Sequence, residues 1–149
     1  FDWVVQKAVE LGVTRLIPIY AQNTQRFKAD KLSSRMEHWR KIILSSSEQS
    51  GRARLLELLE PLELASAVAS STAAAKFILS PHHAGKLSLH AHESVDLLVG
   101  PEGGFNQAEV ELAHQAGFNS WQLGGRILRA ETAALSGVSL LQARFGDFA

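Results

Sequence analysis

The chain has 149 residues, of which 46% are hydrophobic and 20% charged, the balance of a globular domain with a buried core. It contains no cysteine, which excludes disulfides and thiolate metal sites. The formal net charge is zero, so bulk charge does not indicate a nucleic-acid-binding protein. No apolar run approaches the roughly 20 residues that cross a bilayer. Because the chain begins at Phe1 rather than methionine, we expect an N-terminal region to be missing from it.

Charge is distributed unevenly along the chain. Residues 1–60 contain 10 Lys and Arg against 7 Asp and Glu, whereas residues 61–149 contain 5 against 8. This asymmetry fits a basic face that meets phosphates and, equally, ordinary solvated helix faces.

The first part of the chain predicts short strands among helices. Trp3, Val4, Ala8 and Leu11 recur at helical spacing, and Gly12 is placed to end that helix. The expected elements are a helix over 2–11, a strand over 15–21 with a bulge or edge position at Pro18, a polar loop over 22–31, a helix over 32–49 capped by Ser33 or Ser34, and a short strand over 52–59.

The second part continues the alternation of helices and strands. Asn106 followed by Glu109 is a capping-box pattern, which marks the clearest helix start in the chain. Such alternation predicts a single α/β domain with a mostly parallel sheet. The expected elements are a helix over 62–71, strands over 75–79 and 95–99 joined by a His-rich connector, a helix from Asn106 to Gly117, a strand over 118–123 and a helix over 131–145.

Two loops dominate the functional interpretation. Gly100-Pro-Glu-Gly-Gly104 and Leu123-Gly-Gly-Arg-Ile-Leu-Arg129 each follow a strand and precede a helix, where ligands bind in parallel sheets. The glycines at 100, 103 and 104 allow positive φ and close approach of the backbone to a ligand. Neither loop matches the dinucleotide fingerprint or the P-loop. Glycines that serve turn geometry alone are the alternative, but two such loops predict one ligand pocket between them.

These loops carry a family resemblance. Leu98-Val-Gly-Pro-Glu-Gly-Gly-Phe105 and Leu123-Gly-Gly-Arg-Ile-Leu-Arg-Ala-Glu-Thr-Ala133 resemble the SPOUT class, and more narrowly the ribosomal RNA small subunit methyltransferase E family. Gln6-Lys-Ala-Val-Glu-Leu-Gly-Val13, Ser47-Glu-Gln-Ser-Gly-Arg52 and Arg144-Phe-Gly-Asp147 are similar to the same family, in the same order. The resemblance therefore covers essentially the whole chain, residues 1–149.

The resemblance implies a SPOUT-type fold, in which a mostly parallel sheet flanked by helices ends in a C-terminal trefoil knot. The family's additional N-terminal PUA-like domain has no matching segment in this chain. The knot's loops would bind S-adenosylmethionine (SAM) through backbone groups and apolar side chains. The implied cofactor contacts are Leu79, Ser80, Gly100, Pro101, Glu102, Gly103, Leu123, Gly124, Ile127, Leu128 and Arg129.

The family's reaction is methylation of N3 of a uridine in 16S rRNA, and that imide nitrogen must first lose its proton. Arg129 is the first catalytic candidate, because a fixed cation near the uracil carbonyls favours the imide anion. Glu131 would act as base or orient Arg129, and a helix-entry salt bridge is the structural alternative for both. The other functional alternatives are a SPOUT enzyme acting on tRNA or ribose 2′-hydroxyls and a non-catalytic RNA-binding module.

The resemblance implies two partners, which are 16S rRNA or the small ribosomal subunit and a second copy of the chain packed through the knot region. It implies no association with a membrane, and a location in the cytoplasm. Arg26, Lys28 and Arg52 are the candidate contacts to RNA phosphates, with solvated or structural roles as the alternatives. The final apolar helix over 131–145 is expected to be partly buried in the homodimer. His82, His83, His90 and His92 close no zinc-type spacing, so no metal is predicted.

Overall fold

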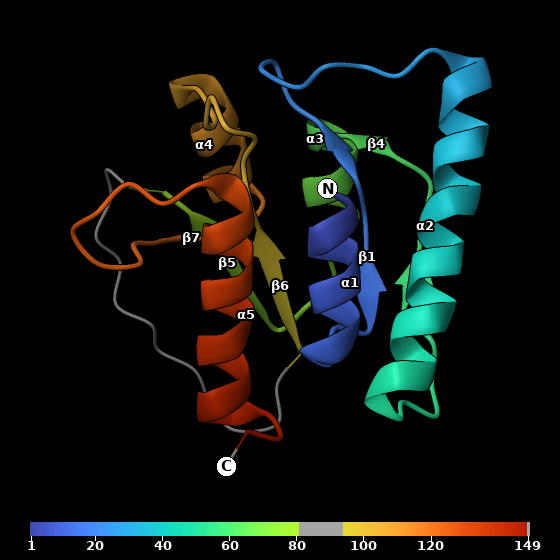
Figure 1. Cartoon of the computed structure of the whole chain (residues 1–149). Coiled ribbons are helices and arrows are strands. Elements are labelled where there is room, and N and C mark those ends of the chain that lie inside the picture. The colour runs from blue at the N-terminus through green and yellow to red at the C-terminus, as the bar shows by residue number, and fades with distance from the viewer. Residues whose placement is uncertain (81–93, 149) are drawn as a thin grey trace.

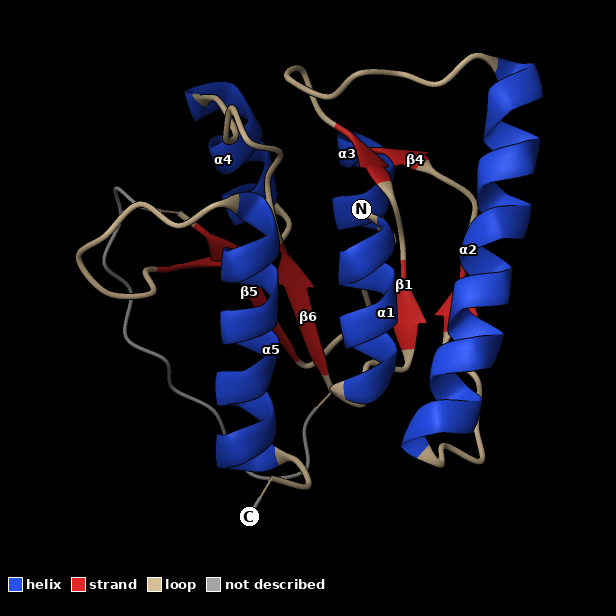
Figure 2. Ribbon diagram, in the orientation of Figure 1, coloured by secondary structure: helices blue, strands red, loops and turns tan. Residues whose placement is uncertain are grey.

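The computed structural model describes residues 1–80 and 94–148. Helices and strands alternate as the sequence predicts, and none of the described helices is long and apolar enough to span a membrane (Figure 2). In chain order the elements are α1 (Asp2–Glu10), β1 (Arg15–Leu16), β2 (Ile19–Tyr20), α2 (Ala29–Ser50), β3 (Glu57–Leu58), β4 (Leu62–Glu63), α3 (Leu64–Ala69), β5 (Ala75–Leu79), β6 (Val95–Leu98), α4 (Gln107–Gln115), β7 (Asn119–Trp121) and α5 (Ala130–Phe145).

The described strands pair in parallel throughout. β5 lies between β6 and β7 in a three-stranded sheet, while β1 pairs with β3 and β2 with β4. The mixed α/β architecture with parallel sheets is confirmed. The predicted trefoil knot stays a prediction, and the His-rich connector with its four histidines lies outside the described residues.

The N-terminal strands are shorter than predicted. The single strand expected over 15–21 is two strands, β1 and β2, separated by Ile17 and Pro18. Pro18 has no N–H to donate to a ladder, although its carbonyl accepts a hydrogen bond from the Leu62 amide at 3.0 Å. The strand expected over 52–59 is limited to β3, and the first two residues of the helix expected over 62–71 form β4 instead.

Helix ends follow the sequence signals only in part. The capping box of α4 is complete, because the Asn106 side chain accepts from the Glu109 amide and the Glu109 carboxylate accepts from the Asn106 amide. Gly12 and Gly117 follow α1 and α4 with positive φ, as predicted. The predicted cap of α2 is wrong, since the helix begins at Ala29, before Ser33 and Ser34, and its N-cap Lys28 makes no side-chain hydrogen bond.

Two regions of packing form the interior. Buried residues of α1 and α2, with Trp39 at their centre, form the first. The second covers the two faces of the three-stranded sheet, where α3 and α4 pack on one side and α5 faces Trp121 on the other. Figure 1 shows α1 and α5 side by side in front of the strands.

Gln142 of α5 joins the two ends of the chain. Its Nε2 donates to the Leu11 carbonyl at 2.7 Å, across 131 residues of sequence. A Cβ atom on Gly12 would lie 2.4 Å from the same Nε2, and Gly12 has a φ of +80°. Gly12 is therefore required both by its backbone conformation and by the approach of Gln142.

We expect Gly12→Ala to lower the free energy of unfolding by about 2–3 kcal/mol, since left-handed backbone costs about 1–2 kcal/mol and displacing Gln142 costs about 1 kcal/mol more. Gly51→Ala is the matched control, because Gly51 has a φ of +70° but a Cβ atom there would meet nothing within 4 Å. Urea unfolding of both variants measures the difference. Equal losses would show that the Gln142 contact contributes nothing.

Candidate functional site

The site lies at one edge of the three-stranded sheet. β6, β5 and β7 run parallel, so their carboxyl ends meet at the same edge. The Ser80 amide donates to the Trp121 carbonyl at 3.1 Å and holds the ends of β5 and β7 together. The predicted cofactor residues after these strands, at 79–80, 100–103 and 123–129, are thereby brought to one edge.

The glycine loop after β6 has three glycines with different physical roles. Gly104 has a φ of +67°, and its amide donates to the Pro101 carbonyl at 2.8 Å to close a turn. Gly100 is not left-handed, but a Cβ atom there would approach the Phe105 ring to 3.2 Å. A Cβ atom on Gly103 would likewise lie 3.1 Å from the Asn23 side chain. Of the three glycines that allow positive φ, only Gly104 therefore adopts it.

The second loop offers apolar side chains and free backbone donors. Ile127 is 83% exposed, while Leu123 packs against the core beside Trp121. Gly124 has a φ of +78°. Within residues 1–80 and 94–148, the loop amides from Gly124 to Leu128 donate to no backbone carbonyl. A ligand with a flat apolar face and polar edges matches this set of groups.

Arg129 and Glu131 lie where the second loop enters α5. Arg129 is the N-cap residue, with φ −63° and ψ 153°, and its carbonyl accepts the Ala133 amide at 2.8 Å. Its side chain is exposed, and Glu131 is half-buried. The ion pairs of the described residues include neither group, so the helix-entry salt bridge considered as the structural alternative is not formed. The predicted chemical roles remain predictions.

The three candidate RNA contacts do not form one patch. Lys28 precedes α2 and Arg52 follows it, and a helix of 22 residues is about 33 Å long (Figure 1). Arg52 is half-buried and donates through Nη1 to the carbonyls of Val9 and Val13, at 2.9 and 2.8 Å. Arg52 therefore has a structural role in joining the end of α1 to the end of α2.

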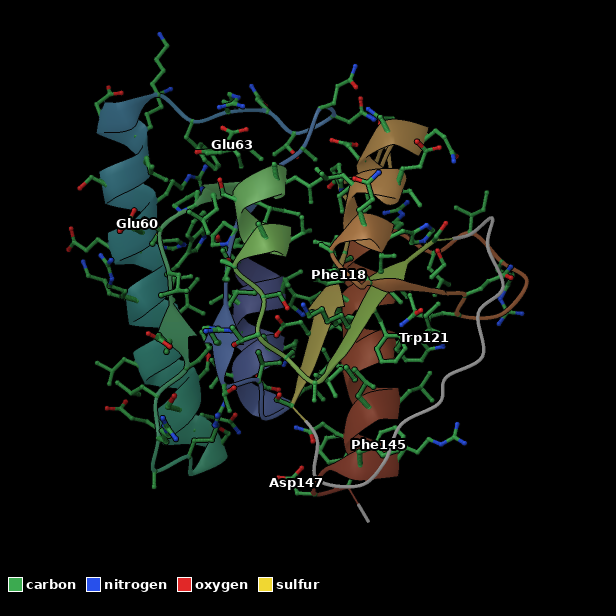
Figure 3. The ribbon with its side chains drawn as sticks, turned by 180° about the vertical axis from the view of Figure 1, so that it is seen from behind. Glu60, Glu63, Phe118, Trp121, Phe145 and Asp147 are labelled. Carbon is green, nitrogen blue, oxygen red and sulfur yellow. The ribbon has the colours of Figure 1, made fainter. Side chains whose placement is uncertain are left out.

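Arg26 is held by a carboxylate rather than left unpaired. Its guanidinium donates to both oxygens of Glu63, at 2.6 and 2.7 Å, and lies 4.9 Å from the centre of the Tyr20 ring. The hydrogen bonds to Glu63 raise the pKa of Arg26 above its ordinary value. Figure 3 shows Glu63 beside the connector from β2 to α2. A phosphate at Arg26 would compete with Glu63.

A cleft of about 640 Å³ opens beside this ion pair. Residues of the β2 end, of α3 and of α4 line it, and none of them belongs to the predicted cofactor set. The lining residues are Tyr20, Ala21, Gln22, Thr24, Arg26, Glu63, Leu64, Ala65, Glu109 and Leu112.

The turn at Gln22 and Asn23 is part of the site, although nothing in its sequence indicates this. Asn23 Nδ2 donates to the carbonyls of Gly103 and Gly104, at 3.3 and 3.2 Å. The Gln22 amide donates to Glu109 Oε1 at 2.7 Å. Both residues belong to a polar loop that resembles any solvated connector, and their partners are at least 80 residues away in sequence.

No group of three or more carboxylates and imidazoles able to hold a metal ion occurs among the described residues. The four histidines singled out in the sequence, His82, His83, His90 and His92, lie in the segment outside them.

The chain resembles known RNA methyltransferases over most of its length. A family model described as an RNA methyltransferase domain matches residues 1–142. Ribosomal RNA small subunit methyltransferase E of Buchnera aphidicola (subsp. Schizaphis graminum) is 35% identical over 98% of this chain and 61% of the relative. The enzyme of the same name from Aquifex aeolicus is 32% identical over 94% of this chain and 61% of the relative.

Two solved structures extend the similarity to the backbone. A Legionella pneumophila protein in complex with bound SAM has a TM-score of 0.95 at 36% identity, and covers 98% of this chain and 62% of its own. Ribosomal RNA small subunit methyltransferase E of Neisseria gonorrhoeae, bound to SAM, has a TM-score of 0.90 at 35% identity over 99% and 62%.

The chain thus spans about three-fifths of the length of these relatives. The relatives bear the name that the two loop motifs predict, and the family model extends from Phe1 nearly to the end of α5. The chain therefore belongs to the family of RNA methyltransferases.

Proposed function

We propose that this domain binds SAM at the edge of the β6–β5–β7 sheet and transfers its methyl group to N3 of a uridine in 16S rRNA of the small ribosomal subunit, in the cytoplasm. The observation that carries the proposal is the convergence of the glycine loop and the 123–129 loop at one sheet edge, at the ends of β6 and β7, the two parallel strands that flank β5. Two proteins with this backbone, at 36% and 35% identity, hold SAM.

The groups at the sheet edge fit this cofactor. Amides of the 123–129 loop, which donate to no backbone carbonyl of the described residues, would bind the polar edge of the adenine, and the exposed Ile127 side chain would cover its face. Leu79, Ser80 and the loop from Gly100 to Gly103 would complete the pocket. When bound, SAM supplies an electrophilic methyl group on a positively charged sulfur.

The chain's own residues would prepare the nucleophile. Uridine N3 is an imide nitrogen whose proton must leave as the N–C bond forms. The exposed Arg129 guanidinium, which has no ion-pair partner among the described residues, can lie against the uracil carbonyls and stabilise the developing anion. The proton would pass to the Glu131 carboxylate or to water.

Arg129→Ala is expected to lower kcat at saturating SAM by about 100-fold, the order seen when one group that stabilises a transition-state oxyanion is removed. Arg126→Ala is the matched control, because Arg126 is an exposed arginine of the same loop without an assigned role. Single-turnover methylation of small subunits lacking the modification measures the rate. Near-normal turnover by Arg129→Ala would remove Arg129 from the catalytic groups.

The site of methylation tests the reaction itself. Digestion of the modified 16S rRNA and mass spectrometry of its nucleosides should yield 3-methyluridine. Methyl groups on ribose 2′-oxygens, or on tRNA in place of 16S rRNA, would refute the substrate assignment. If calorimetry shows that the protein binds no SAM, the enzyme assignment itself fails.

We further propose that two copies pack through α5. Gly137 is the one buried residue among the described positions of this 16-residue helix, and Leu140 is 50% exposed. Ala133, Leu135, Val138 and Leu141 are half-buried, so α5 keeps apolar surface that the described residues do not cover. A second copy packed isologously would cover it.

Leu140→Glu should therefore convert the dimer to a monomer in sedimentation velocity, since it would place a charge in the apolar interface. Leu44→Glu on α2 is the control, because Leu44 is 51% exposed on another helix. A monomeric wild-type protein, or an equal effect of both substitutions, would refute the interface.

A further inference from the structure

The turn after β2 is closed by two hydrogen bonds and reaches the glycine loop. The Thr24 amide donates to the Ala21 carbonyl at 3.0 Å, and the Ala21 amide donates back to Thr24 Oγ1 at 3.2 Å. These two hydrogen bonds fix the backbone on both sides of Gln22 and Asn23. The turn can therefore serve as a fixed support rather than a loose connector.

Two neighbouring carbonyls of the glycine loop accept hydrogen bonds from this turn. Asn23 Nδ2 lies 3.3 Å from the Gly103 oxygen and 3.2 Å from the Gly104 oxygen. The peptide unit is planar, so a fixed carbonyl also fixes the amide on the opposite side of the same plane. The two bonds therefore orient the N–H groups of Gly104 and Phe105. The first of these closes the turn onto Pro101.

The same turn also holds the start of α4. Glu109 Oε1 accepts the Gln22 amide at 2.7 Å, while Glu109 Oε2 accepts the Asn106 amide at 2.9 Å. The Asn106 side chain in turn donates to Gln22 Oε1. The turn thus supports the end of the glycine loop through Asn23 and the start of α4 through Gln22.

Close packing makes this support specific to Asn23. A Cβ atom on Gly103 would lie 3.1 Å from the Asn23 Cβ and 3.2 Å from its Nδ2. Gly103 does not have positive φ, so its glycine is explained by this contact rather than by backbone conformation. The glycine loop and the turn are therefore matched in shape as well as in hydrogen bonding.

We infer that Asn23 is a positioning residue for SAM binding, which holds the backbone of the glycine loop in the geometry that receives the cofactor. This inference rests on the proposed function, in which Gly100 to Gly103 contact SAM. Asn23 itself belongs to the N-terminal part of the chain, between β2 and α2, and is not among the residues expected to touch the cofactor.

Calorimetric titration of SAM into the wild-type protein and the Asn23→Ala and Asn23→Asp variants tests the inference. Asn23→Ala removes both hydrogen bonds, and we expect Kd for SAM to rise about three- to tenfold. Asn23→Asp keeps the shape of the side chain but sets a carboxylate against two carbonyl oxygens, so its Kd should rise further. Because Asn23 is exposed, Tm should change by no more than about 2 °C.

Gln107→Ala is the matched control, since Gln107 is an exposed amide side chain that, among the described residues, donates only within α4, to Glu111 Oε1 at 3.0 Å. Its Kd should equal that of the wild-type protein. A Kd unchanged in Asn23→Ala, or raised equally in Gln107→Ala, would overturn the positioning role while leaving the proposed function intact. Absence of SAM binding by the wild-type protein would overturn the proposed function and this inference with it.

A double-mutant cycle of Asn23 and Gly103 tests whether the two residues act through their direct contact or through a general loosening of the glycine loop. Gly103→Ala should weaken SAM binding in the wild-type background, because the added Cβ pushes the loop away from Asn23. In the Asn23→Ala background the added Cβ no longer meets the side-chain amide, although it still meets the Cβ of residue 23, so its effect should be smaller than in the wild-type background. Strictly additive effects would contradict a direct contact between the two residues in the binding-competent loop.

Discussion

The close approach of α5 to the three-stranded sheet is the constraint on which the site depends. A Cβ atom on Gly137 would lie 2.9 Å from Leu97, 3.4 Å from Leu79 and 3.7 Å from Trp121, so only a glycine lets the helix come this near. Figure 3 shows Trp121 at this contact, between β7 and α5. The helix begins at the same edge where the strands end, and this packing sets where Arg129 stands relative to both loops.

Hydrogen bonds from the N-terminal part of the chain hold two further segments in place, the end of α5 and the glycine loop. Gln142 ties the end of α5 to Leu11, and Asn23 ties the glycine loop to the turn after β2. Each bond crosses at least 80 residues of sequence. The N-terminal helices and turns are thus part of the support of the proposed cofactor site, although the residues expected to contact SAM come from the last half of the chain.

Sequence patterns predicted the features that depend on residues close together in the chain. The capping box at Asn106 and Glu109 is formed as expected, because both partners lie within one helical turn. The roles of Arg26 and Arg52 could not be predicted in this way, since their partners Glu63 and Val9 are 37 and 43 residues away. Among the described residues, the alternation of helices and strands and the edge carrying the two loops were predictable, whereas the contacts that hold the loops depend on tertiary packing.

The glycine loop is a motif whose interpretation changes once its tertiary contacts are known. From sequence alone the three glycines are explained by freedom of the backbone, either near a ligand or in a tight turn. In the structure, Gly104 supplies the left-handed turn, Gly100 makes room for Phe105, and Gly103 makes room for Asn23. Two of the three therefore shape the loop from within the protein. Because a loop packed so closely cannot move without displacing Asn23 or Phe105, its backbone groups are held in place by the protein alone, in advance of the cofactor that the proposed function assigns to them.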